Sequence, residues 1–237
     1  MPDPTNAAAR RGAVERWSAV AREKWRAIAP DAPERLVGPG SPSFRCQPNI
    51  CDALCCGAPY LAGTSERDVA GLREAGEETI HFLDIDPGEL TELFDQGQRW
   101  SQIVTLRQES GRCVFLQDER RCGVYGQRPD GCALFPYRIV FVPREEERIA
   151  VTIDSVEAMD RSVRIALGWT AGGGGFKGSA AGGLPEYVPL VLRDMSCPGF
   201  TEAPMGSEDY AALLERIWEL DACTSHAWPC DRHEHLA

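Results

Sequence analysis

The sequence predicts an α+β fold, in which a small antiparallel sheet with flanking helices surrounds a cysteine-ligated metal site. Three observations lead to this prediction. Apolar residues recur at helical spacing near both ends of the chain, short β-prone runs alternate with polar turns in the middle, and seven of the ten cysteines fall in two tight clusters. A chain of 237 residues is long enough to bury a core without covalent staples.

Helices are predicted where apolar residues recur every three or four positions. In the N-terminal segment, Trp17, Ala21 and Trp25 follow this spacing and indicate an amphipathic helix over about residues 7–28. Capping residues and an Asp-Pro step place further helices at about 65–75 and 87–94, and periodicity places others at 156–167 and from Ser207 onward.

Strands are predicted in the middle of the chain, where β-branched and aromatic residues alternate with turn residues. The predicted strands cover residues 103–107, 112–116, 121–125, 137–142 and 148–153. The last two are expected to form a hairpin over Pro143–Glu147.

Composition divides the chain into three parts. Residues 1–43 are expected to form a helix and a linker, because Ala32–Pro42 is rich in proline and glycine. Residues 44–200 are expected to form the cysteine-cluster domain, with a flexible glycine-rich loop at 171–183. Residues 201–237 are expected to form a C-terminal helix and tail.

Charge and hydropathy exclude several classes of function. A net charge of −11 argues against a nucleic-acid partner, because phosphate contacts need a basic face. No apolar run approaches the ~18 residues of a membrane span, and charged residues interrupt the N-terminus where a signal peptide would be apolar. The chain is therefore expected to be cytoplasmic and not to bind membranes. In that compartment thiols stay reduced, so clustered cysteines are more often metal ligands than disulfides.

The spacing of the cysteines predicts how they could bind metal. If residues 50–56 are helical, Cys51 and Cys55 share one face, Cys56 is rotated by about 100°, and Cys46 approaches from the preceding loop. The second cluster contains Cys113, Cys122 and Cys132. Thiolates brought together from both clusters suit either zinc or an iron-sulfur cluster such as 4Fe-4S, and spacing does not choose between them. The vicinal pair Cys55-Cys56 then serves either two sites or one site plus the core.

The motifs FRCQPNICDALCC, CVFL, CGVY and RPDGCALFP resemble the YkgJ family of cysteine-cluster proteins. This family is also known as the CxxCxxCC zinc- or iron-chelating domain, and the flagellin lysine N-methylases are related to it. The resemblance covers about residues 44–142 and extends to Cys197 in DMSCPGF. It implies a metal-binding domain whose ligands are Cys46, Cys51, Cys55, Cys56, Cys113, Cys122, Cys132 and Cys197.

Two classes of function follow. The first is a metalloprotein whose zinc or iron centre has a structural, sensory or metal-handling role, with a metal ion and a protein as partners. The second is an iron-sulfur-dependent enzyme that modifies a protein substrate, such as a lysine N-methylase. No catalytic residues and no cofactor loop stand out in the sequence, which favours the first class. The tail residues Cys223, His226, Cys230 and His233 have metal-like spacing, but their role is left open.

Overall fold

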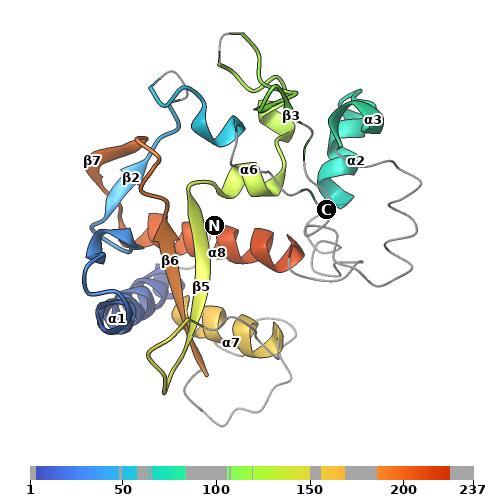
Figure 1. Ribbon diagram of the computed structural model, residues 1–237. Helices are drawn as coiled ribbons and strands as arrows, with labels where there is room; N and C mark the ends of the chain where they lie inside the picture. The colour runs from blue at the N-terminus through green and yellow to red at the C-terminus, as the bar shows by residue number, and fades with distance from the viewer. Residues whose placement is uncertain are drawn as a thin grey trace. The chain divides into compact units, whose positions relative to one another are not determined.

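The computed structural model describes residues 4–47, 50–57, 64, 66–83, 106, 108–118, 120–149, 156–168 and 186–224 (Figure 1). The chain divides into two compact units. Unit 1 comprises Met1–Phe44, Tyr137–Met195 and Phe200–Trp218, and unit 2 comprises Arg45–Pro136, Ser196–Gly199 and Glu219–Ala237. Helices and small antiparallel sheets occur together in the described residues, which confirms the predicted α+β class.

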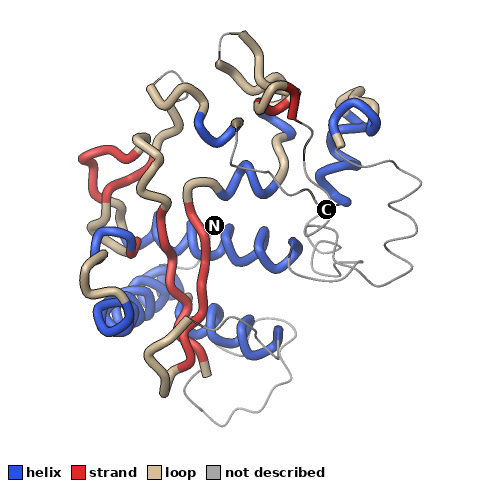
Figure 2. The backbone as a smooth tube through the Cα atoms, viewed as in Figure 1, coloured by secondary structure: helices blue, strands red, loops and turns tan. Residues whose placement is uncertain are grey.

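In its described residues, unit 1 contains a three-stranded antiparallel sheet, a two-stranded sheet and three helices that extend beyond two turns. In chain order its elements are α1 (Pro4–Ile28), η1 (Pro33–Arg35), β1 (Leu36–Val37), β2 (Pro42–Phe44), β5 (Tyr137–Pro143), α7 (Val156–Ala166), β6 (Tyr187–Arg193), β7 (Phe200–Pro204) and α8 (Ser207–Thr224), of which residues up to Trp218 belong to this unit. Figure 2 shows that β5 and β6 are longer than the strands of unit 2.

The three-stranded sheet has the order β1-β6-β5, so β6 is its central strand. Val140 pairs with Leu190 and Val142 with Val188, which places these four side chains on one face. The five central residues of β6 are all buried, so both faces of this strand are covered. A continuous apolar run such as VPLVL is typical of a strand in that position.

Helices cover the two faces of this sheet. Ala21 and Trp25 of α1 pack against Val188, Leu190 and Leu192. On the opposite face, the ring of Phe141 meets that of Trp218 from α8 edge-on, with 5.8 Å between centroids. Figure 1 shows α8 crossing behind β5 and β6. The apolar faces of the helices therefore bury the sheet by the hydrophobic effect.

The two-stranded sheet of unit 1 pairs β2 with β7 and carries an aromatic cluster. The rings of Phe44, Tyr137 and Phe200 lie with centroids 5.6–5.8 Å apart, in tilted or edge-to-face contacts. The guanidinium of Arg193 lies 4.6 Å from the centre of the Phe200 ring. Such contacts favour the close pairing of two short strands beyond the area that they bury.

Unit 2 has little regular secondary structure in its described residues. Its elements are η2 (Leu54–Cys56), α2 (Glu66–Glu74), α3 (Thr79–Phe82), β3 (Gln108–Glu109), β4 (Arg112–Cys113), η3 (Tyr125–Gln127) and α6 (Asp130–Leu134). Its apolar core contains Val69, Leu72, Phe82, Leu83, Leu106, Phe115 and Val124. Three cysteines, Cys113, Cys122 and Cys132, pack directly against this core. The buried carboxylate of Asp68 in α2 accepts a hydrogen bond of 3.0 Å from the Asp130 backbone N–H at the start of α6.

The structure confirms the predicted helices at 7–28, 65–75 and 156–167 and the one from Ser207, but it corrects several strands. β5 pairs with β6, and Arg148 and Ile149, the described part of the predicted strand 148–153, lie outside any strand. The predicted strand 112–116 is reduced to β4, and 121–125 is no strand. Leu36 and Val37 were predicted as part of the linker. They form β1 instead, which pairs with the edge of β6 that β5 leaves open.

Some predictions fall on residues that the structure does not describe. These are the helix at 87–94, the glycine-rich loop at 171–183, the tail with Cys230 and most of the strand at 103–107, of which Leu106 forms a bridge with Leu83. Among the residues that are described, no helix has the length and hydropathy needed to cross a bilayer.

A glycine after α7 generates a prediction for unit 1. Gly168 has a φ of +72°, and a Cβ there would lie 2.8 Å from the Cβ of Ala13 in α1. Gly40 in the same unit has a φ of +87° with open space around it. We expect Gly168→Ala to lower the free energy of unfolding by about 1–3 kcal/mol more than Gly40→Ala, because only the first adds an overlap to the strained backbone. Urea unfolding measures the difference. Equal losses of unfolding free energy in the two variants would show that α1 moves away from the added Cβ at no cost.

Candidate metal centre

Unit 2 contains a cavity of about 400 Å³ whose walls carry seven cysteines. These are Cys46, Cys51, Cys55, Cys56, Cys113, Cys122 and Cys132. Apolar side chains of the unit 2 core, among them Leu106, Phe115 and Val124, form part of the same wall. The two sequence clusters, which lie more than fifty residues apart, therefore share one cavity.

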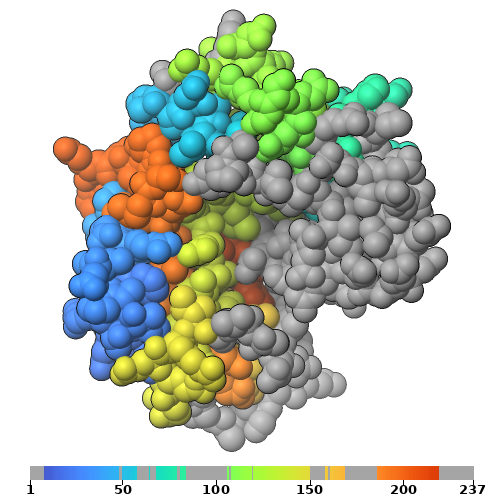
Figure 3. All heavy atoms as spheres, in the orientation of Figure 1, coloured from blue at the N-terminus to red at the C-terminus, as the bar shows by residue number. Residues whose placement is uncertain are grey.

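Short backbone contacts hold the cysteine-bearing segments together. At the start of the 45–57 segment, the Arg45 N–H donates to the carbonyl of Gly199, two residues beyond Cys197. At its end, Gly57 forms an antiparallel bridge with Arg112, next to Cys113. Figure 3 shows the cyan residues of this segment beside the green residues around 108–128. Each anchor thus lies next to cysteines of two different segments.

The backbone between Cys51 and Cys56 is not the α-helix that the sequence predicted. Asp52 and Ala53 both have positive φ values, 54° and 53°, and the chain then makes one 3₁₀ turn over Leu54–Cys56. The helical face that Cys51 and Cys55 were expected to share is therefore absent. Cys56 was expected to point away from its neighbour, but it lines the same cavity as Cys55. The left-handed pair of residues explains the difference, because it breaks the 100° step of a helix.

Cys55 and Cys56 are linked by a hydrogen bond between their side chains. This bond lowers the pKa of Cys55 to about 7, with further help from its own backbone N–H and from Arg128. The same bond raises the pKa of Cys56 far above its usual range, because its thiol keeps the proton that it donates. At pH 7 the negative charge of the vicinal pair is therefore held on Cys55, which is about half ionised, while Cys56 stays protonated.

Burial raises the pKa of most of the other thiols. The effect is largest for Cys132, whose pKa reaches about 12 because burial and the nearby thiolates both oppose its ionisation. Desolvation also raises the pKa of Cys113 and Cys122, although each accepts a backbone hydrogen bond that favours its thiolate. These thiols stay protonated at neutral pH until a cation offsets their charge.

The cavity wall also provides positive charge. Arg128 lines the cavity and lowers the pKa of Cys46, Cys55 and Cys122, although for Cys46 and Cys122 burial outweighs it and the net shift is upward. Its guanidinium stacks on the ring of Tyr125, 4.4 Å from the centroid.

Cys197 is not in the cavity wall, but it belongs to the same electrostatic environment. Burial raises its pKa first, and nearby Cys51, Cys55 and Cys46 raise it further. Unit 2 therefore holds all eight cysteines that the sequence singled out. His81 is exposed on α3, and its Nε2 lies 3.8 Å from a carboxylate oxygen of Glu78. Cys223 lies at the end of α8, and His226, Cys230 and His233 are outside the described residues.

Metal chemistry fits this donor set, although the described ligands do not converge as they stand. Among the residues that the structure places, no three Cys, His, Asp or Glu side chains lie close enough together to hold one ion. The thiols nevertheless line one cavity, and none of the eight is in a disulfide. Thiolates are the ligands that zinc and iron-sulfur clusters prefer. The sulfurs would have to move inward within the cavity to complete a coordination shell.

The pKa values predict which thiol of the metal-stripped, reduced protein reacts first. Iodoacetamide at pH 7 should modify Cys55 well before Cys132, because the thiolate is the reactive form. Cys56→Ala should slow the reaction of Cys55 at pH 7, since the donated proton is lost, whereas Cys56→Ser keeps a donor and serves as the matched control. Peptide mass mapping over pH 5–9 gives the rates. Equal rates for Cys55 and Cys132 would contradict the hydrogen-bonded pair.

Comparison with known proteins adds one relationship. Residues 45–155 match the CxxCxxCC family model, whose description is "Putative zinc- or iron-chelating domain". No curated protein and no solved structure matches the chain. The match spans the 45–57 segment, β4, η3 and α6, and so includes all seven cysteines of the cavity wall. Residues 45–155 of this chain are therefore similar to the CxxCxxCC family, described as a "Putative zinc- or iron-chelating domain".

Proposed function

We propose that unit 2 binds zinc or iron through cysteine thiolates and that the bound centre has a structural, sensory or metal-handling role. One observation carries the proposal: seven thiols from two distant parts of the chain line a single cavity. The match to a chelating domain supports the same function. Such a role fits a cytoplasmic protein, where free thiols persist.

The number of thiols favours more than one tetrahedral ion. Four thiolates complete a tetrahedral zinc site, and four cysteines also hold a 4Fe-4S cluster. The Arg45–Gly199 hydrogen bond brings Cys46 toward Cys197, and the Gly57–Arg112 bridge brings Cys56 toward Cys113. We therefore propose two ligand sets. The first contains Cys46, Cys51, Cys55 and Cys197, and the second contains Cys56, Cys113, Cys122 and Cys132.

Cys55 acts electrostatically on the thiols of both sets. It raises the pKa of Cys46 and Cys197 in its own set and of Cys56, Cys113, Cys122 and Cys132 in the other. A thiolate that acts on every other perturbed thiol is within electrostatic range of both proposed sets. The vicinal pair Cys55-Cys56 then places one ligand in each set, which gives a physical use to two adjacent cysteines.

A second candidate function is an iron-sulfur-dependent enzyme that modifies a protein, such as a lysine N-methylase. The observation that favours it is the volume of the cavity, since about 400 Å³ falls in the range of small-molecule sites. The walls combine thiols with the apolar side chains of Leu106, Phe115 and Phe135. A cavity of this size has space for a cofactor or a substrate side chain in addition to the metal.

Purification without oxygen, followed by metal and sulfide analysis, tests the proposal. A colourless protein with about two zinc ions per chain supports two thiolate sites, and a brown protein with iron and acid-labile sulfide supports a cluster and raises the enzyme alternative. Full-length protein with less than 0.1 equivalent of either metal, on the order of background, would refute the proposal.

Serine substitutions test the position of Cys55. Because each thiol is assigned to one ligand set, Cys55→Ser should remove metal from the first set only and Cys56→Ser from the second set only, and the double variant should lose metal from both sets. Cys223→Ser is the matched control, because this cysteine belongs to neither set. Metal counts on the purified variants give the result. A double variant that loses no more metal than either single variant would show that the two thiols serve the same ion.

Binding should also release protons. Burial raises the pKa of Cys113, Cys122, Cys132 and Cys197, so each enters the site as a thiol at pH 7 and must lose its proton to become a ligand. Cys55, with a pKa of about 7, is already about half ionised and should release less. Affinity should therefore fall as the pH falls from 8 to 6. Zinc titration in buffers of different ionisation enthalpy counts the protons, and a count near zero would contradict thiol ligation.

A further inference from the structure

Two charged side chains connect the cysteine segments beside the cavity. The Nε of Arg120 lies 2.9 Å from an Oδ1 carboxylate oxygen of Asp52. Asp52 directly follows Cys51, and Arg120 precedes Cys122 by two residues. Arg120 also lines the cavity. The ion pair thus spans from the segment of the first cysteine cluster to that of the second.

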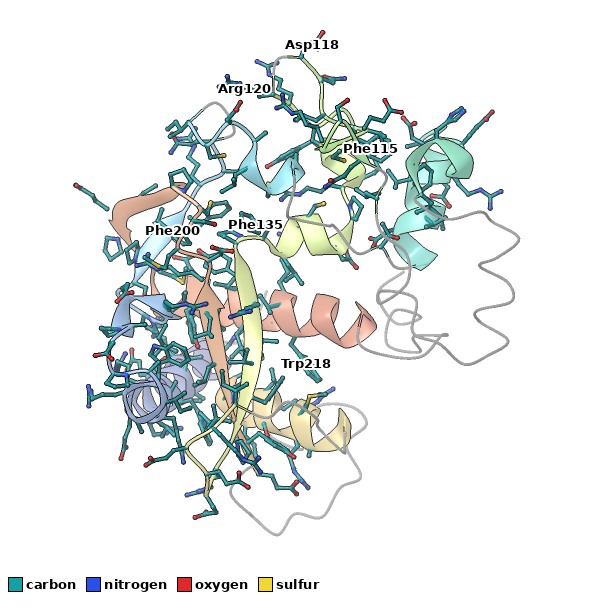
Figure 4. The ribbon with its side chains drawn as sticks, viewed as in Figure 1. Phe115, Asp118, Arg120, Phe135, Phe200 and Trp218 are labelled. Carbon is teal, nitrogen blue, oxygen red and sulfur yellow. The ribbon has the colours of Figure 1, made fainter. Side chains whose placement is uncertain are left out.

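Tight turns present both side chains. Asp52 and Arg120 each have a left-handed backbone, with φ values of 54° and 60°. The turn before Arg120 is closed by a hydrogen bond of 2.9 Å from its N–H to the carbonyl of Gln117, and Leu54 N–H donates to the Cys51 carbonyl at 3.2 Å. In Figure 4, Asp118 lies at the tip of the 117–122 turn and Arg120 at its base. The pair is therefore fixed by local backbone geometry at both ends.

The ion pair lies between the two backbone anchors of the 45–57 segment. Arg45 bonds to Gly199 at one end, and Gly57 bridges to Arg112 at the other. Asp52 sits near the middle, on the stretch that carries Cys51 and Cys55. Without a contact there, that stretch would be joined to the segment of Cys113 and Cys122 only at its end, through the Gly57–Arg112 bridge.

We propose that the Asp52–Arg120 ion pair is a clasp that positions Cys51 and Cys55 opposite Cys122 so that a bound metal centre can take ligands from both segments. The inference rests on the proposed metal binding and assigns these two residues as positioning residues. The clasp shortens the inward movement that the thiols need, since the described ligands do not yet converge. It contacts no metal itself.

The exposure of the pair sets the size of its effect. The side chains of Arg120 and Asp52 are 48% and 70% exposed, so solvent screens their attraction. We therefore expect each neutral variant to bind zinc about two- to fivefold more weakly. Screening also predicts that raising the salt concentration from about 0.05 to 0.5 M weakens zinc binding in the natural protein more than in the neutral variants.

A zinc competition assay on metal-stripped, reduced full-length protein tests the clasp. The proteins compared are the natural protein, Asp52→Asn, Arg120→Gln, the double neutral variant and the charge-exchanged Asp52→Arg/Arg120→Asp. The expected result is that the double variant loses no more affinity than either single one and that the exchanged pair regains it, because one interaction is removed and restored. Glu146→Gln, which breaks the exposed pair with Arg148 in unit 1, is the matched control and should leave affinity unchanged.

The outcomes separate the two proposals. If the natural protein binds zinc and the single variants bind it equally well, or if their losses add in the double variant, the clasp is refuted while metal binding stands. If the natural protein binds neither zinc nor iron, the proposed function fails first. Thermal unfolding of the same metal-stripped proteins detects a variant that binds poorly because it is unfolded. In that case the charge-exchanged variant gives the answer. If it regains both its thermal stability and its zinc affinity, the ion pair is supported, and if it regains stability alone, the clasp is refuted.

Discussion

The structure of unit 2 depends on limiting the negative charge of its clustered thiols. Seven thiols share one cavity, and ionising them together without a cation would place several negative charges on a partly apolar wall. The protein limits that charge in two visible ways. Burial keeps thiols such as Cys132 protonated, and the Cys56 thiol donates to the Cys55 thiolate. Arg128 adds one fixed positive charge, held against Tyr125. A metal centre would replace many protons at once, which is why binding and proton release are linked.

The two units achieve their folds by different means. In unit 1, a central strand buried on both faces and helices with apolar faces supply the stability expected of an ordinary core. In unit 2, the core is small, and Cys113, Cys122 and Cys132 pack on it directly. The same residues thus line the cavity and complete the core. A substitution there changes packing as well as ligation, so metal counts need to be compared with the stability of each variant.

Sequence reasoning predicted what local patterns determine. Helical periodicity in α1, α7 and α8 and the cysteine clusters were sufficient for the α+β class and for the eight thiols that gather in unit 2. The pairing of strands that lie far apart in the sequence could not be predicted from local patterns. The strand β6 follows a glycine-rich stretch and carries no alternation, so its role as the partner of β5 was missed. The turn at Asp52 and Ala53 was also missed, because two left-handed residues without glycine have no clear sequence signal.

The identity of the atoms around a bound metal tests the account most directly. X-ray absorption at the zinc or iron edge, on protein purified without oxygen, reports the ligands and their distances. Thiolate ligation by the cavity cysteines predicts a shell dominated by sulfur, at about 2.3 Å for zinc. A shell made only of nitrogen and oxygen at about 2.0–2.1 Å would contradict it, because the metal would then be held elsewhere in the chain.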